Sequence, residues 1–150
     1  MSSTVVVSGN PRPGSRTAQV AQRLAQELGS DEPSIIELGE LTDELFVGGE
    51  RVSAAEESVR NATEIVVATP SYKGSFTGLL KVFLDRFATA ELGDLRAHVV
   101  AVAASGAHVA STIEHLRLVL GELGARPGTS LGLTEDRLAD LDRVITEVLG

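Results

Sequence analysis

The sequence contains no cysteine and no tryptophan, and its 150 residues include a single tyrosine, Tyr72. Without cysteine the chain has no disulfides, no thiolate nucleophile and no zinc site with cysteine ligands. These three chemistries are therefore excluded before any motif is considered, whereas the redox compartment of the protein is left open.

Basic side chains are also scarce, with 13 Lys and Arg residues against 21 Asp and Glu residues and a formal net charge of -8. A surface of this charge repels nucleic acid and anionic lipid, so we expect neither a nucleic-acid partner nor a membrane partner. An anionic ligand has to be held by local donors, such as the backbone N–H groups at the start of a helix.

Long hydrophobic runs are missing as well. The first apolar run, Val5–Val7, is too short for a signal peptide or a membrane span, and no basic region precedes it. We therefore expect a cytoplasmic location. The length, with 43% hydrophobic and 23% charged residues, suits a single globular domain spanning residues 1–150.

Apolar runs of strand length alternate with segments of helical periodicity. The expected strands lie at Val5–Val7, Ile35–Ile36, Ile65–Ala68, Val99–Ala103 and, with a weaker pattern, Leu131–Leu133. The expected helices lie at Val20–Leu28, Arg51–Ala62, Leu79–Phe87, Val109–Leu123 and Leu138–Val148. The sequence thus predicts five strands, each followed by a helix.

Strands that are apolar on both faces, separated by amphipathic helices, predict an α/β fold with a parallel sheet covered by helices on both faces. With right-handed crossovers, the common doubly wound order for five strands is 2-1-3-4-5. Ligands of such sheets bind beyond the carboxyl ends of the strands, at the switch point between strands 1 and 3. The loops after these two strands are therefore the expected site.

The loop after the first strand, Gly9–Thr17, has the composition of a phosphate-binding loop. Its two glycines allow close backbone approach, and Ser15 or Thr17 can cap the following helix. The first N–H groups of that helix would bind a phosphate monoester, aided by Arg16 and Arg12. The alternative is an ordinary turn with a serine cap and two solvated arginines.

A nucleoside-triphosphate-binding P-loop fits this segment poorly, although Gly9 and Gly14 have the required spacing. The P-loop lysine that contacts the β- and γ-phosphates is replaced by Ser15. Strand 3 ends in Ala68-Thr69-Pro70 and supplies no aspartate for magnesium. The sequence therefore disfavours an NTPase, and without a G-x-S-x-G elbow it gives no support to a hydrolase.

The loop after the third strand, Thr69–Gly78, is the second specialised segment. Pro70 fixes one turn, Gly74 and Gly78 allow close backbone approach, and the single tyrosine, Tyr72, lies between Pro70 and Gly74. A flat aromatic ring can rest against such a segment, the alternative being an exposed loop. Phe76 is expected to be a core residue.

The chain contains three histidines, and two of them lie in the fourth expected helix. His98 is expected near the start of a strand, and His108 and His115 are interpreted as surface or interface residues of one helix, not metal ligands. Leu118 and Val119 lie outside the apolar stripe of that helix, which predicts a homodimer or homotetramer. The alternative is a helix fully buried in a monomer.

The segments Gly9–Thr17 and Ala68–Lys81, in this order, resemble the NADPH-dependent FMN reductase family, and most of all the reductases that serve alkanesulfonate monooxygenases. The likeness extends from the first strand to about Pro127. It implies a flavodoxin-like fold and an NAD(P)H-dependent enzyme that transfers hydride from NADPH or NADH to FMN. The electrons would then pass to a monooxygenase partner, a quinone or a similar acceptor.

The resemblance also implies which residues bind the cofactor. Ser8, Arg16 and Thr17, with the backbone between them, would hold the FMN phosphate, and the isoalloxazine would lie between the third-strand loop and Ser105-Gly106. The complete expected set is Ser8, Asn10, Arg12, Ser15, Arg16, Thr17, Pro70, Ser71, Tyr72, Lys73, Gly74, Ser105 and Gly106. No catalytic acid or base is expected, because hydride passes directly from nicotinamide C4 to flavin N5.

The chain departs from the family pattern after strand 4 and near its C-terminus. Ala104-Ser105-Gly106 replaces paired glycines, and no aromatic residue lies near Glu114, where some sulfonate-linked reductases carry one. The segment Thr129–Asp136 is short, which predicts a more open flavin site. Two alternatives remain, a flavodoxin-type electron carrier without NAD(P)H turnover and a flavin-free scaffold. The carrier is disfavoured because its flavin is commonly sandwiched by Trp and Tyr.

Overall fold

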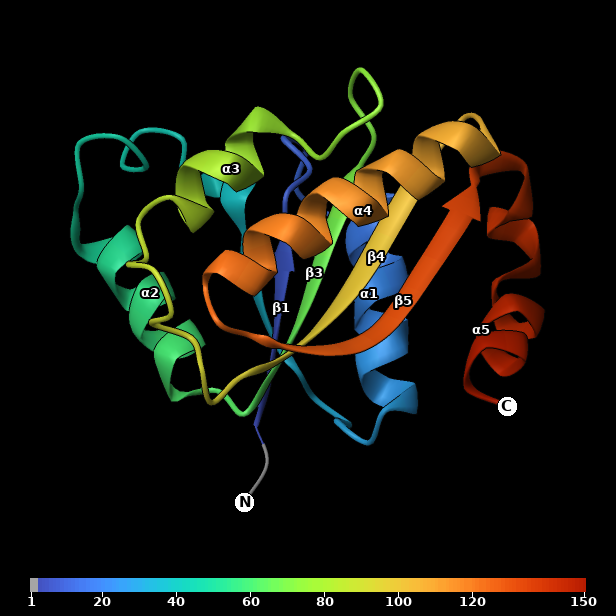
Figure 1. Cartoon of the computed structure of the whole chain (residues 1–150), viewed down its shortest axis with the longest axis horizontal. Coiled ribbons are helices and arrows are strands. Elements are labelled where there is room, and N and C mark those ends of the chain that lie inside the picture. Colours follow the sequence, from blue (N-terminus) through green and yellow to red (C-terminus); the bar gives the residue numbers. More distant parts are fainter. Residues whose placement is uncertain (1–2) are drawn as a thin grey trace.

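The structure is a computed structural model that describes residues 3–150, in which strands and helices alternate along the chain (Figure 1). The strands are β1 (Thr4–Ser8), β2 (Ser34–Glu37), β3 (Glu64–Pro70), β4 (Arg96–Ala103) and β5 (Arg126–Thr134). The α-helices are α1 (Arg16–Glu27), α2 (Glu50–Asn61), α3 (Gly78–Leu84), α4 (Gly106–Glu122) and α5 (Leu141–Leu149). Two 3-10 helices are η1 (Leu38–Glu40) and η2 (Glu135–Asp140).

All strand pairs are parallel, and the order in the sheet is β2-β1-β3-β4-β5. The predicted flavodoxin-like, doubly wound α/β fold is therefore confirmed. The order reverses beside β1, because the chain adds β2 on one side of β1 and then returns to add β3 on the other. The carboxyl ends of β1 and β3 consequently lie next to each other, with Ser8 paired with Ala68.

Two hydrophobic cores cover the two faces of the sheet. Successive side chains of a strand point to opposite faces, so Val5 and Val7 belong to one core and Val6 to the other. The core around Val6 packs against α1 and α5, through residues such as Leu24 and Ile145. The second core packs against α2, α3 and α4 on the opposite face (Figure 1). The central strands are apolar throughout because both of their faces are buried.

Some element boundaries differ from the sequence expectation. Helix α3 ends at Leu84, and Phe87 lies in the turn beyond it, still buried and edge-to-face with Phe83 at a centroid distance of 5.4 Å. Leu138 lies in η2, before the start of α5. Strand β5 is longer than its apolar run because its first residues lie at the exposed sheet edge, where polar side chains are tolerated. Phe76 is partly buried against the core, as expected.

The start of β4 carries a buried polar cluster that the apolar pattern concealed. His98 is 1% exposed, its Nε2 lies 2.9 Å from Glu64 Oε1, and its Nδ1 accepts the Thr129 N–H at 2.9 Å. This histidine therefore links three strands and is not a surface group. None of the helices described within residues 3–150 has both the length and the apolar character needed to cross a membrane.

Candidate functional site

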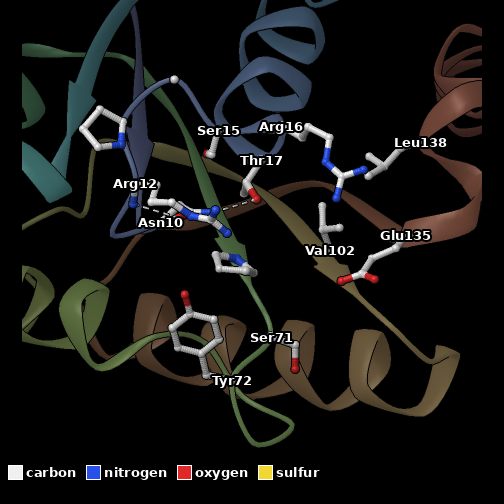
Figure 2. A pocket seen from close by; sticks show the side chains of 13 residues that line it. Asn10, Arg12, Ser15, Arg16, Thr17, Ser71, Tyr72, Val102, Glu135 and Leu138 are labelled. Atoms are coloured by element: carbon white, nitrogen blue, oxygen red, sulfur yellow. Dashed lines mark hydrogen bonds between the residues drawn. The ribbon is translucent and has the colours of Figure 1, made fainter.

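A cavity of about 520 Å³ opens at the carboxyl edge of the sheet, at the switch point predicted from the strand order (Figure 2). The loops after β1 and β3 form two of its walls. Val102 at the end of β4 and residues of η2 complete the lining. Its size is within the range of about 300–1,000 Å³ that is usual for ligand sites.

The loop after β1 is shaped by its own side chains. Asn10 Oδ1 accepts the Arg12 N–H at 2.9 Å, and Asn10 Nδ2 lies 3.4 Å from Thr17 Oγ1, as Figure 2 shows. Ser15 caps α1, its Oγ accepting the Ala18 N–H at 3.2 Å. The N–H groups of Arg16 and Thr17, at the start of α1, have no intrahelical acceptor, so they are suited to bind an anion.

The end of β2 supports this loop from below. Gly14, whose φ is +68°, donates its N–H to Glu37 Oε2 at 2.6 Å. Glu37 pairs in register with Ser8, which is fully buried. Within residues 3–150, Ser8 Oγ and Glu37 Oε1 are buried side-chain atoms without a hydrogen-bond partner. Ser8 therefore lies beneath the loop and not in the cavity wall.

The loop after β3 forms a tight turn. Tyr72 and Ser75 exchange backbone hydrogen bonds of 2.8 and 3.2 Å around Lys73 and Gly74, whose φ angles are +56° and +76°. Positive φ at both central residues is typical of a type I′ turn. Gly74 packs against α4, where Ser111 Oγ donates to the Gly74 carbonyl. Tyr72, 49% exposed, lines the cavity, whereas the tip of the turn does not.

Most of the residues expected to bind the cofactor line the cavity, namely Asn10, Arg12, Ser15, Arg16, Thr17, Pro70, Ser71 and Tyr72. The others, Ser8, Lys73, Gly74, Ser105 and Gly106, are not part of its lining. Ser105 instead caps α4, its Oγ accepting the His108 N–H at 3.3 Å, and Gly106 is the first residue of that helix.

Sequence reasoning missed Val102, Glu135 and Leu138, which also line the cavity. Val102 looked like any residue of a buried strand. Glu135 and Leu138 come from η2, far along the chain from the two loops, and no local motif marked them. Glu37 does not line the cavity, but it contacts the first loop through the Gly14 N–H. It could have been noticed in the sequence as an acidic residue directly after the apolar run Ile35–Ile36.

The charged side chains of the cavity lining are Arg12, Arg16 and Glu135. None of the three side chains forms an ion pair or hydrogen bond within residues 3–150. Both arginines are exposed at the mouth of the anion-binding loop. The lining is therefore cationic at the start of α1, although the protein as a whole is acidic.

The histidines of α4 lie against the turn of the β3 loop. His115 Nδ1 is 2.9 Å from Ser75 Oγ, and the His108 ring lies next to Gly74. No group of three or more His, Asp and Glu side chains suited to a metal ion occurs in the part of the chain that the structure describes. These two histidines thus pack around the turn.

The cavity of this flavodoxin-like α/β protein brings a helix start, two arginines and an aromatic side chain together at the switch point, a combination suited to a nucleotide phosphate. The model of the NADPH-dependent FMN reductase family matches residues 3–133. The chain belongs to this family.

Individual relatives agree with the family match. The NADH-dependent FMN reductase SfnE of Pseudomonas putida is 32% identical over 130 residues, which cover 81% of this chain and 70% of that protein. The apo structure of the NADH:FMN oxidoreductase EMOB is 30% identical, with a TM-score of 0.83 over 99% of this chain and 88% of that one. An oxidoreductase from Corynebacterium diphtheriae, 23% identical, shares the fold with a TM-score of 0.77 over 99% and 93% of the two chains.

These findings confirm the family predicted from the two loops. The protein is an enzyme of the NAD(P)H-dependent FMN reductase family, with FMN and a nicotinamide nucleotide as the cofactors and substrates of that family. The carrier without NAD(P)H turnover and the flavin-free scaffold are the less favoured alternatives.

Proposed function

We propose that the cavity binds FMN with its phosphate at the start of α1 and its ring against the loop after β3. The observation that carries this proposal is the anion-binding loop at the switch point. Gly14 has a positive φ, a backbone conformation that favours glycine. Ser15 caps α1, and Arg16 is the first residue of this helix. Backbone donors, a hydroxyl and a cation suit a dianionic phosphate monoester.

The ring wall has groups suited to an isoalloxazine. Ser71 Oγ accepts the hydroxyl hydrogen of Thr112 at 3.0 Å, so the hydrogen of the Ser71 hydroxyl stays available for a ligand acceptor. Tyr72 presents an aromatic face that can stack on a flat ring. The N–H of Ser71 donates to the Val102 carbonyl at 2.8 Å, which holds this wall against β4. The residues therefore fit the flavin.

FMN, when bound, supplies the redox chemistry by accepting a hydride from the nicotinamide nucleotide. The chain has to hold the flavin, orient it and leave one face open to the nucleotide, so no acid or base is needed in the lining. The names of SfnE and EMOB describe those proteins as using NADH. For this chain we propose NADH or NADPH as the donor and a flavin-dependent monooxygenase, a quinone or a similar compound as the acceptor.

We further propose a homodimer or homotetramer in the cytoplasm that uses α4 as part of its interface. Leu118 on this helix is 68% exposed, and Val119 beside it is partly buried against the core. We take the exposed Leu118 side chain as part of a surface that a second copy of the chain covers, because interface cores are depleted of charged residues.

Titration of the purified protein with FMN, followed by NADH and NADPH oxidation, tests the proposal. Flavin-dependent turnover supports the reductase. Tight flavin binding without turnover would point to an electron carrier, and no flavin binding to a scaffold.

The phosphate position is tested with Arg16→Ala. One charge-assisted hydrogen bond contributes about 1.5–3 kcal/mol, so FMN binding should weaken roughly 10- to 100-fold. Riboflavin, which lacks the phosphate, should bind the variant and the parent equally. Arg23→Ala is the control, because it removes a cation from the same helix that is paired with Glu27 and Asp142 outside the cavity. Equal losses for both flavins would place the phosphate elsewhere.

A further inference from the structure

The cavity wall contains a carboxylate where an anion site usually has only donors and cations. The chain enters η2 directly after β5, and this short helix brings Glu135 and Leu138 into the lining. Figure 2 shows Glu135 extending toward Val102, on the same side of the cavity as the end of the Arg16 side chain. The next residue, Asp136, is not part of the lining.

Glu135 is the only acidic side chain of the lining within the described residues, and it is unpaired there. The Glu135 side chain is exposed, so solvent satisfies its carboxylate and no cation is required beside it. Arg137 of η2 pairs with Glu147 instead, at 3.6 Å. Glu135 therefore adds a negative charge to the cavity, on the same side as the end of the Arg16 side chain.

We propose that Glu135 lowers the affinity for FMN by repelling its phosphate, and so keeps the flavin exchangeable between catalytic cycles. The inference rests on the proposed FMN site. Repulsion between a carboxylate and a dianion does not need direct contact at low salt, because the Debye length is about 30 Å at roughly 0.01 M ionic strength. Arg16 attracts both the Glu135 carboxylate and the phosphate. The negative charge of Glu135 therefore reduces the contribution of Arg16 to phosphate binding.

The test compares Glu135→Gln with Asp136→Asn. Both variants remove one negative charge from adjacent residues of η2, but only the first removes it from the cavity lining. Dissociation constants and dissociation rates are measured for FMN and for riboflavin by flavin fluorescence. The measurements are made at low salt and again at about 1 M salt, where the Debye length shrinks to roughly 3 Å.

Glu135→Gln should bind FMN about 3- to 10-fold more tightly at low salt, through a slower dissociation rate. The gain should shrink at high salt, riboflavin binding should not change, and Asp136→Asn should match the parent. These results together would establish that the carboxylate acts on the phosphate.

Three results would overturn the inference. Equal FMN affinity for Glu135→Gln and the parent would show that the charge has no effect. Weaker binding of both flavins would show that Glu135 accepts hydrogen bonds from the ribityl hydroxyls. An equal gain for Asp136→Asn would assign the effect to net charge. If the parent binds no FMN at all, the proposed function itself fails, which is a different result from all three.

Discussion

Thr77 Oγ1 donates a hydrogen bond of 2.7 Å to the carbonyl of Gly9, so that the loops after β1 and β3 are joined across 68 residues of sequence. The same oxygen accepts the Leu80 N–H at 3.1 Å and caps α3. The Thr77 N–H donates to Thr69 Oγ1 at 3.2 Å, and the side chain is 1% exposed. One buried hydroxyl thus joins the two loops that form walls of the cavity.

Thr77→Val should lose about 1–3 kcal/mol of unfolding free energy, because it leaves the Gly9 carbonyl and the Leu80 N–H without a buried partner. FMN binding should weaken as well, since the two walls are no longer held together. Urea unfolding and flavin titration measure both effects. Thr77→Ser keeps the hydroxyl and should stay close to the parent in affinity; a serine variant as weak as the valine variant would argue against the hydroxyl's role.

Gly39→Ala should disturb the loop Gly9–Thr17, although Gly39 lies outside this loop in the sequence. A Cβ at this position would lie 2.2 Å from the Pro11 carbonyl oxygen, so the loop after β1 has to move. Overpacking of this kind costs about 1–3 kcal/mol. We expect a lower melting temperature and weaker FMN binding.

Gly121→Ala is the matched control for Gly39→Ala. A Cβ at Gly121, in α4, meets nothing within 4 Å. Alanine in a helix interior is more favourable than glycine by about 0.5–1 kcal/mol, so this variant should be more stable than the parent and bind FMN unchanged. A loss of FMN affinity in both variants would show that the effect of Gly39→Ala does not depend on its contact with Pro11.

Arg117→Met should destabilise the fold and leave the flavin site intact. The guanidinium donates to the carbonyls of Ala97, Gly128 and Thr129 at 2.6, 3.0 and 2.9 Å. Burial lowers the pKa of Arg117, but a guanidinium stays protonated at neutral pH. Removing it should cost about 1–3 kcal/mol per carbonyl left buried and unpaired.

Arg126→Met, on the exposed first residue of β5, is the control for the Arg117 variant. It removes the same charge but none of the carbonyl contacts that Arg117 makes, and surface changes of this kind are usually within about 0.5 kcal/mol. Thermal unfolding and flavin titration distinguish the two. Equal stability of both variants would mean that the Arg117 contacts contribute little.

Leu118→Glu should dissociate the proposed oligomer, because a charge replaces an apolar side chain that is 68% exposed in the single chain. Light scattering after size exclusion should show a smaller mass for the variant than for the parent. Leu149→Glu, at the end of α5 and 39% exposed, should leave the mass unchanged. A parent of monomeric mass would refute the oligomer.

The alternation of strands and helices, together with the common topology of doubly wound sheets, was enough to predict the sheet order and the two loops that line the cavity. Runs such as Val5–Val7 and Ile65–Ala68 are apolar on both faces, and this pattern is typical of central parallel strands. The two loops were recognisable because the first carries two glycines, hydroxyls and two arginines in one short segment, and the second carries two glycines, hydroxyls and Tyr72. Local patterns of this kind are encoded by neighbouring residues, so reading them needs no knowledge of long-range contacts.

The tertiary structure alone decided which other residues meet those loops. Glu37 reaches Gly14, Thr77 reaches Gly9, and Glu135 joins the cavity from the far end of the chain. His98 was also hidden, because its partners lie on other strands. Such contacts depend on the register and crossovers that bring distant segments together, and no periodicity along the chain records them.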